Sequence, residues 1–149
     1  MNIKISSLPI SLITALLLAA ASLMAIAPIT RVHAEAVASF EDKAVYHVDD
    51  PSVAAMALRN IVNHLNASPG VKISLVANGK GITMLAADEY FPQIAELQRR
   101  GVRFVACNNS MKGFGIEASK LVPGAVIVPA GVAELSRLQV VEHYAYIKP

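Results

Sequence analysis

The 149-residue sequence has no tryptophan, only one cysteine, few aromatic residues and almost no excess of either charge. A single cysteine cannot form an intramolecular disulfide bond, which excludes a small domain held together by disulfides. The 13 Lys+Arg nearly balance the 11 Asp+Glu. The chain therefore lacks the surplus of positive charge with which proteins neutralise nucleic-acid phosphates, and we expect no nucleic-acid partner. Its length allows one domain of ordinary size.

A long uncharged run lies near the start of the chain. No charged residue occurs between Lys4 and Arg31, and residues 10–27 are almost wholly apolar. A short positive region, an apolar core and small residues before a cleavage point are typical of a signal peptide. We therefore interpret residues 1–34 as a signal peptide that is cleaved after Ala34.

An uncleaved membrane anchor is the alternative, because the charge-free span 5–30 is long enough to cross a bilayer. In that case the protein would remain attached to the membrane. In both cases we expect residues 35–149 to be delivered across a membrane, which in a bacterium means the periplasm. This part carries 11 Lys+Arg and 11 Asp+Glu, since Lys4 and Arg31 are the only charged residues before it.

Residues 35–149 alternate between short β-rich runs and amphipathic segments, a pattern typical of α/β proteins. The pattern predicts five strands, over residues 43–48, 71–77, 102–106, 125–128 and 144–147. It predicts helices between them, over residues 51–66, 91–100, about 111–120 and 132–141, with residues 82–88 ambiguous. We therefore expect a three-layer α/β/α sandwich with a mostly parallel sheet and helices on both of its faces.

In such a sheet the usable crevice lies at the carboxyl ends of the strands. Among the residues predicted at this edge, Cys107 alone has strong nucleophilic chemistry. A thiolate is favoured near a helix amino terminus, where Asn109 or Ser110 can donate hydrogen bonds. The competing interpretation is that Cys107 is a small buried hydrophobic residue, because free cysteine is among the most buried residue types.

Other polar residues at this edge are weaker candidates for a site. Asn78 and Gly79, in the Asn78-Gly-Lys-Gly81 turn, could bind an anion, although a tight turn also explains the glycines. His47 lies near the end of the first strand and could face Cys107 across the sheet. Histidine, cysteine and carboxylate residues show no zinc-binding spacing, so we expect no metal.

The sequence also resembles the DsrE/DsrF-like sulfur-relay family over essentially all of residues 35–149. Its most telling segment is Gly-Val-x-Phe-x-x-Cys-x-Asn-[Ser/Thr], matched here from Gly101 to Ser110. Further similarity lies in Val45 to Asp50, Leu58 to Leu65, Asn78 to Ile82, Ala125 to Leu135 and the tail from Tyr144. The chain is most similar to the exported single-domain branch of the family.

The resemblance implies a doubly wound, flavodoxin-like α/β subunit that assembles as a homotrimer or homohexamer and holds sulfane sulfur as a persulfide. This role falls on Cys107, with Asn109 and Ser110 as supports and with Asn78, Gly79, His47 and Asn108 as candidate binding residues. Many relatives have a histidine before the glycine of the second edge loop, where this chain has Asn78.

Thiol exchange requires no cofactor and no second cysteine. A thioredoxin-like oxidoreductase would need a resolving cysteine, which the chain lacks. The expected partners are thus a sulfur donor and an acceptor, either small thiols or proteins. The alternative function is a non-catalytic module of the same fold that binds a small ligand or a partner protein.

Overall fold

The computed structural model describes residues 41–149. Its five strands are β1 (Lys43–Val48), β2 (Lys72–Ala77), β3 (Arg103–Cys107), β4 (Val126–Val128) and β5 (Ala145–Ile147). Its helices are α3 (Ala54–Ala67), α4 (Phe91–Arg99), α5 (Asn108–Gly113) and α6 (Gly131–Val140). Short 3-10 segments cover Pro51–Val53, Gly79–Ala86, Asp88–Tyr90 and Ala118–Lys120. The predicted signal peptide, residues 1–34, lies outside the described residues.

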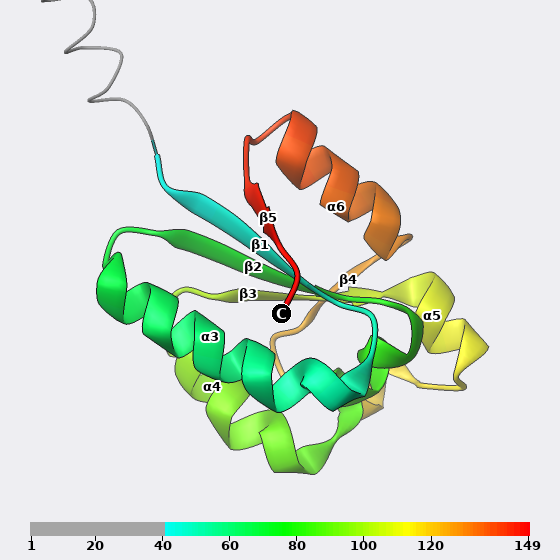
Figure 1. The fold of residues 1–149 in the computed structure, drawn as a ribbon. Coiled ribbons are helices and arrows are strands. Elements are labelled where there is room, and N and C mark those ends of the chain that lie inside the picture. Colours follow the sequence, from blue (N-terminus) through cyan, green and yellow to red (C-terminus); the bar gives the residue numbers. More distant parts are fainter. Residues whose placement is uncertain (1–40) are drawn as a thin grey trace, which may run out of the picture. The chain divides into compact units, whose positions relative to one another are not determined.

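The five strands form one parallel sheet in the order β4-β3-β2-β1-β5. Helices α3 and α4 lie on one face of this sheet, whereas α6 crosses the other face (Figure 1). The short helix α5 follows β3 directly at the carboxyl edge of the sheet (Figure 1). The predicted α/β/α sandwich with a parallel sheet is therefore confirmed.

Two hydrophobic cores of unequal size hold the layers together. The large core fills the space between the sheet and helices α3 and α4, and includes the fully buried Phe104, Leu58 and Leu97. The small core joins the sheet to α6 through three strand valines and two leucines, namely Val45, Val76, Val105, Leu135 and Leu138. Because buried apolar area is the main source of stability, α6 is the most weakly anchored layer.

Several predicted boundaries match the structure, and two are wrong near the candidate cysteine. The first strand is found as predicted, and Asp50 caps the following segment by accepting a hydrogen bond from the Ser52 N–H at 2.8 Å. Cys107 is the last residue of β3 rather than the first residue beyond it. The helix predicted over about 111–120 is instead α5 at Asn108–Gly113, which begins immediately after Cys107.

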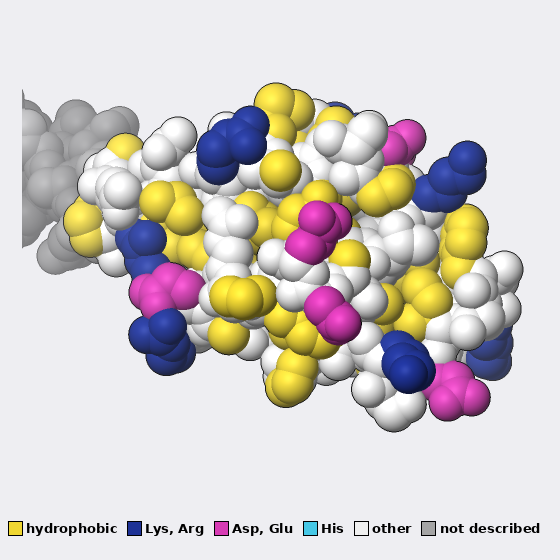
Figure 2. All heavy atoms as spheres, turned by 90° about the horizontal axis from the view of Figure 1, so that it is seen from below, with side chains coloured by type: hydrophobic (Ala, Val, Ile, Leu, Met, Phe, Trp, Pro, Cys, Tyr) yellow, Lys and Arg dark blue, Asp and Glu magenta, His cyan; other side chains and the backbone are white. Residues whose placement is uncertain are grey.

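One face of the described residues is mixed in charge. On the face that carries α3 and α4, Lys and Arg side chains are interspersed with Asp, Glu and apolar groups (Figure 2). None of the helices within residues 41–149 combines the length and the apolar character that a bilayer crossing requires.

Candidate functional site

Four neighbouring strands place polar side chains at the carboxyl edge of the sheet, on the face covered by α6. Strand side chains alternate between the two faces. Val45, Val76 and Val105 pack toward α6, so the residues two positions further on, His47, Asn78 and Cys107, lie on the same face. Tyr146 of β5 is in register with Val45 and joins this row. The row follows the order of the strands across the sheet, β5, β1, β2 and β3.

Cys107 is buried, with 5% of its surface exposed, but its sulfur lies among hydrogen-bond donors. Burial raises the pKa of the Cys107 thiol, whereas hydrogen bonds from the Ser110 hydroxyl and from the N–H groups of Gly131, Ser110 and Asn109 lower it. The balance is a pKa below the ordinary value of a thiol. Hydrogen bonds to the charged form favour that form, so this environment favours the thiolate.

The Ser110 hydroxyl connects the cysteine to the neighbouring loop. The Gly79 N–H donates to Ser110 Oγ at 2.9 Å, which leaves the single hydroxyl proton free to be donated to the Cys107 sulfur. Gly79 has a φ of +53°, a conformation that glycine adopts at no steric cost. Gly81 is required for space, because a Cβ there would lie 2.2 Å from the carbonyl oxygen of Val48.

The first residue of helix α6, Gly131, packs against the residues at the end of the sheet. A Cβ at Gly131 would lie 3.0 Å from the Cβ of Asn78 and 3.1 Å from the Cβ of Cys107. Gly131 is therefore in close contact with both residues, and its small size lets its N–H reach the sulfur. This contact also shows that Asn78 and Cys107 lie beside each other at the end of the sheet.

His47 is held at both ring nitrogens. Its Nε2 lies 2.8 Å from Asn78 Oδ1, and its Nδ1 lies 2.7 Å from the Tyr146 hydroxyl. The two rings of His47 and Tyr146 are tilted, with centroids 5.7 Å apart. His47 lies on the same face as Cys107, as predicted, but Asn78 stands between them.

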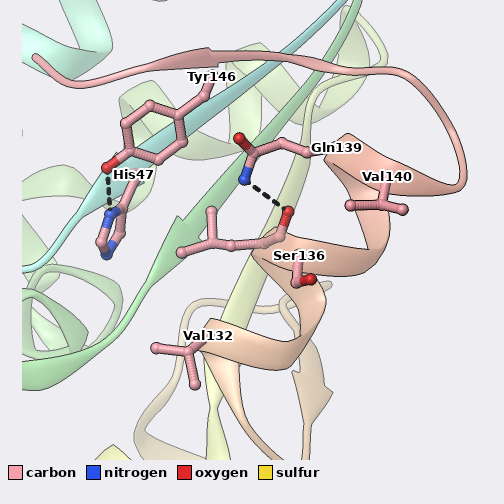
Figure 3. Close-up of a pocket in the computed structure, with 7 residues that line it drawn as sticks. His47, Val132, Ser136, Gln139, Val140 and Tyr146 are labelled. Atoms are coloured by element: carbon pink, nitrogen blue, oxygen red, sulfur yellow. Dashed lines mark hydrogen bonds between the residues drawn. The ribbon is translucent and has the colours of Figure 1, made fainter.

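A shallow groove of about 390 Å³ runs from His47 and Tyr146 along helix α6 (Figure 3). Its lining contains apolar and uncharged polar side chains and no lysine, arginine or carboxylate: His47, Val132, Leu135, Ser136, Gln139, Val140 and Tyr146. Val132, at the start of the groove, follows Gly131 in the chain. The groove thus begins next to the cysteine environment and offers an uncharged surface to a ligand.

The structure brings most of the predicted site residues together. Cys107, Ser110, Asn78, Gly79 and His47 form one connected group, as described above. Asn109 contributes its backbone N–H to the cysteine sulfur. Asn108 begins α5 and is not among the groups that bond the sulfur.

Two contributors, Tyr146 and Gly131, were missed. Tyr146 lies almost one hundred positions after His47, and the sequence offers only the alternation within β5 as a signal for it. Gly131 directly precedes the helix predicted over residues 132–141 and is the first residue of α6 in the structure. The available signal was a glycine at the first position of a helix. Other residues favour helix formation more than glycine does, so a glycine there indicates a close contact.

A second polar cluster lies on the other side of α6. Glu134 is 8% exposed and accepts hydrogen bonds from Arg103 Nη1 at 2.5 Å and Arg137 Nε at 2.8 Å. The Arg137 hydrogen bond, followed by that of Arg103, lowers the pKa of Glu134 to about 2 against the opposing effect of burial. This ion pair ties α6 to β3 and has a structural role. Within residues 41–149, no three His, Cys, Asp or Glu side chains are grouped to hold a metal ion.

Comparison with known proteins gave a family and several related structures. The model of the DsrE/DsrF-like family matches residues 33–149. A protein of unknown function from Methanobacterium thermoautotrophicum, MTH1491, is 34% identical, with a TM-score of 0.67 over 72% of this chain and 99% of its own. A search of curated proteins gave no significant match.

Two more distant structures share the fold. A conserved protein of unknown function from Bacteroides thetaiotaomicron, BT1422, is 19% identical, with a TM-score of 0.58 over 72% of this chain and 95% of its own. The ychN protein from E. coli is 13% identical, with a TM-score of 0.61 over 74% of this chain and 100% of its own.

Proposed function

Since the chain belongs to the DsrE/DsrF-like family, we propose that it is a sulfur carrier that holds sulfane sulfur as a persulfide on Cys107. The observation that carries the proposal is the environment of this sulfur. Burial raises the pKa of the Cys107 thiol, but the Ser110 hydroxyl and the N–H groups of Gly131, Ser110 and Asn109 lower it below the ordinary value, and Gly131 and Asn78 lie against this residue. A purely structural cysteine needs no such donors, because a neutral thiol packs well among apolar groups.

Sulfur uptake is a thiol exchange at the outer sulfur of a donor persulfide, R–S–SH. The Cys107 thiolate attacks this sulfur, a new S–S bond forms to Cys107, and the donor leaves as the thiolate R–S⁻. An acceptor thiolate then attacks the outer sulfur of Cys107–S–SH, takes it as a new persulfide and restores the Cys107 thiolate. The two steps balance without net oxidation or reduction and without a cofactor.

The four donors also fit the charge changes in this cycle. Negative charge is present on the Cys107 sulfur before uptake and returns to it when the outer sulfur leaves. Donors that stabilise this charge increase the thiolate fraction before uptake and make the same sulfur a better leaving group in delivery. The uncharged groove beside Asn78 and Gly131 offers a place for the body of a donor or an acceptor.

Intact-mass analysis of the protein after incubation with polysulfide tests the proposal. Because the chain has a single cysteine, any sulfur that a reductant removes must have been on Cys107. The expected result is a mass increase of one or more sulfur atoms in the wild type that reductant reverses and that Cys107→Ser lacks. A folded wild-type protein that takes up no sulfur would overturn the proposal.

The second candidate function is a binding module that does not use the thiol. The low exposure of Cys107 and the open groove along α6 favour it. In that case Cys107 would resist both sulfur loading and alkylation in the folded protein, and Cys107→Ser would behave as the wild type does. The same mass experiment therefore separates the two functions.

We further propose that the protein is exported and forms a homotrimer or homohexamer. Export rests on the sequence of residues 1–34, and the N-terminal residue of protein recovered from the bacterial periplasm tests it. Assembly is supported by exposed apolar side chains on α6 and the sheet edges, including Val132, Val140, Ile127 and Tyr146. Sedimentation that shows only monomers at micromolar concentration would contradict assembly.

A further inference from the structure

We infer that Tyr146 and His47 are positioning residues that orient the Asn78 amide toward the Cys107 sulfur, so that Asn78 Nδ2 donates to the sulfur when it is anionic. This inference rests on the proposed function and identifies further residues that support it. Tyr146, His47 and Asn78 form a hydrogen-bonded row across neighbouring strands, and the row ends beside Cys107.

The hydrogen bonds define a direction along this row. Asn78 Oδ1 can only accept, so His47 Nε2, at 2.8 Å, must carry a proton and donate it. In a neutral imidazole the other nitrogen is then an acceptor, and the Tyr146 hydroxyl at 2.7 Å donates to His47 Nδ1. Tyr146 and Asn78 together hold His47 with its proton on Nε2, and this N–H in turn holds the asparagine amide with Oδ1 toward His47 and Nδ2 on the other branch.

Asn78 lies beside the cysteine, and its amide oxygen is engaged by His47. Its oxygen is occupied by His47, so its NH2 group lies on the opposite branch of the planar amide. A Cβ added at Gly131 would lie 3.0 Å from Asn78 Cβ and 3.1 Å from Cys107 Cβ, so the two side chains leave the sheet next to each other. Within residues 41–149, Asn78 Nδ2 donates to no other side chain or carbonyl group, which leaves both of its protons for the site.

The inner and the outer sulfur of a Cys107 persulfide lie at different distances from the end of β3 and need different donors. The donors from Gly131, Ser110 and Asn109 reach the sulfur of Cys107 itself. An outer sulfur extends further from the strand end and needs a donor at greater distance. The Asn78 amide is a side-chain donor on the neighbouring strand end, so it fits either the thiolate or the added sulfur.

The test is the rate of Cys107 alkylation and of sulfur loading, measured across pH in the full-length protein. Loss of a hydrogen bond to a charged group lowers the alkylation rate of Asn78→Ala at neutral pH by roughly tenfold. We expect smaller losses of roughly threefold for His47→Ala and Tyr146→Phe, which act through Asn78. His47→Gln keeps an N–H that can reach Asn78 Oδ1 and should recover part of the lost rate.

The chain supplies a matched control on the opposite face of the sheet. There the Tyr46 hydroxyl lies 3.1 Å from His64 Nδ1, away from the cysteine. His64→Ala and Tyr46→Phe remove the same chemical groups and should leave the pH profile of alkylation unchanged. Tyr146→Phe removes one oxygen from a partly exposed side chain, so thermal unfolding should show it folded even if His47→Ala is not.

The possible outcomes separate the positioning role of Tyr146, His47 and Asn78 from the carrier function of Cys107. Wild-type pH profiles in folded Asn78→Ala and Tyr146→Phe would overturn the positioning role, while sulfur loading of the wild type would still support the carrier function. Conversely, a wild type that never loads sulfur would contradict the carrier function, and the alkylation profiles alone would then decide whether Asn78 supports the thiolate.

Discussion

Removal of the Ser110 hydroxyl should make Cys107 markedly less reactive near neutral pH. The hydroxyl is the one side-chain donor among the four groups that bond the sulfur, and it lowers the pKa of the thiol more than any single backbone N–H does. A hydrogen bond to a charged group is worth about 1.5–3 kcal/mol, which is at least about a tenfold change in an equilibrium constant. Ser110→Ala should therefore raise the pKa of Cys107 and lower its thiolate fraction at neutral pH by roughly tenfold or more.

The functional effect follows from the thiolate fraction. At a pH below the pKa of the thiol, a higher pKa lowers the thiolate fraction, and the alkylation rate falls in proportion to that fraction. In the wild type, Ser110 Oγ accepts a hydrogen bond from the exposed Gly79 N–H. Water can replace this acceptor in Ser110→Ala, so the fold should persist.

The assay is the iodoacetamide reaction rate against pH, followed by intact mass. Ser110→Thr retains the hydroxyl and should behave much as the wild type does. Ser136→Ala removes a hydroxyl from the groove, where it does not bond the cysteine, and should have no effect. An unchanged pH profile in folded Ser110→Ala would refute the reasoning, because it would show that the hydroxyl does not stabilise the thiolate.

Two further predictions concern the scaffold. Gly81→Ala places a Cβ 2.2 Å from the carbonyl oxygen of Val48, so its free energy of unfolding, measured in urea, should fall by more than about 3 kcal/mol. Gly70 has open space around it, so Gly70→Ala should lower this free energy by less than about 1 kcal/mol. Glu134→Gln should lower the free energy of unfolding by about 2 kcal/mol at neutral pH, because Glu134 is buried and loses two arginine partners. The loss is no larger because both arginines are partly exposed and solvent screens the pairs. Because the folded pKa of Glu134 is lowered from 4.5 to about 2, this stability is present above about pH 4.5 and is lost as pH falls toward 2. Glu96→Gln, at an exposed pair, should change stability by less than about 0.5 kcal/mol; equal losses in both glutamate variants would contradict the buried role of Glu134.

The sequence predicted the fold because its local patterns are strong. The strand over Lys43–Val48 was found with its bounds intact, and the parallel sheet follows from the alternation of such runs with amphipathic helices. The segment after Cys107 was harder, because Asn108 to Ser110 is polar and lacks apolar periodicity. The helix follows β3 directly and begins at Asn108, three residues earlier than predicted.

The candidate site was predictable only in part. Strand ends of a parallel sheet meet at one edge, so Asn78, Cys107 and His47 could be placed near one another from the order of elements alone. The tyrosine that bonds His47 could not be placed there from the order of elements, because β5 pairs with β1 only after the chain crosses the sheet through α6. Tyr146 is thus brought to the site by topology, which spacing in the sequence does not reveal.

The central claim is that Cys107 both accepts sulfur and gives it up. The most direct test loads the protein with isotopically labelled sulfane sulfur, removes the excess and adds an acceptor thiol. If Cys107 is a carrier, the label leaves the protein for the acceptor and Cys107 returns to a free thiol, with no label bound in Cys107→Ser. Label that stays on the folded protein, or that binds equally well without Cys107, would contradict a carrier function.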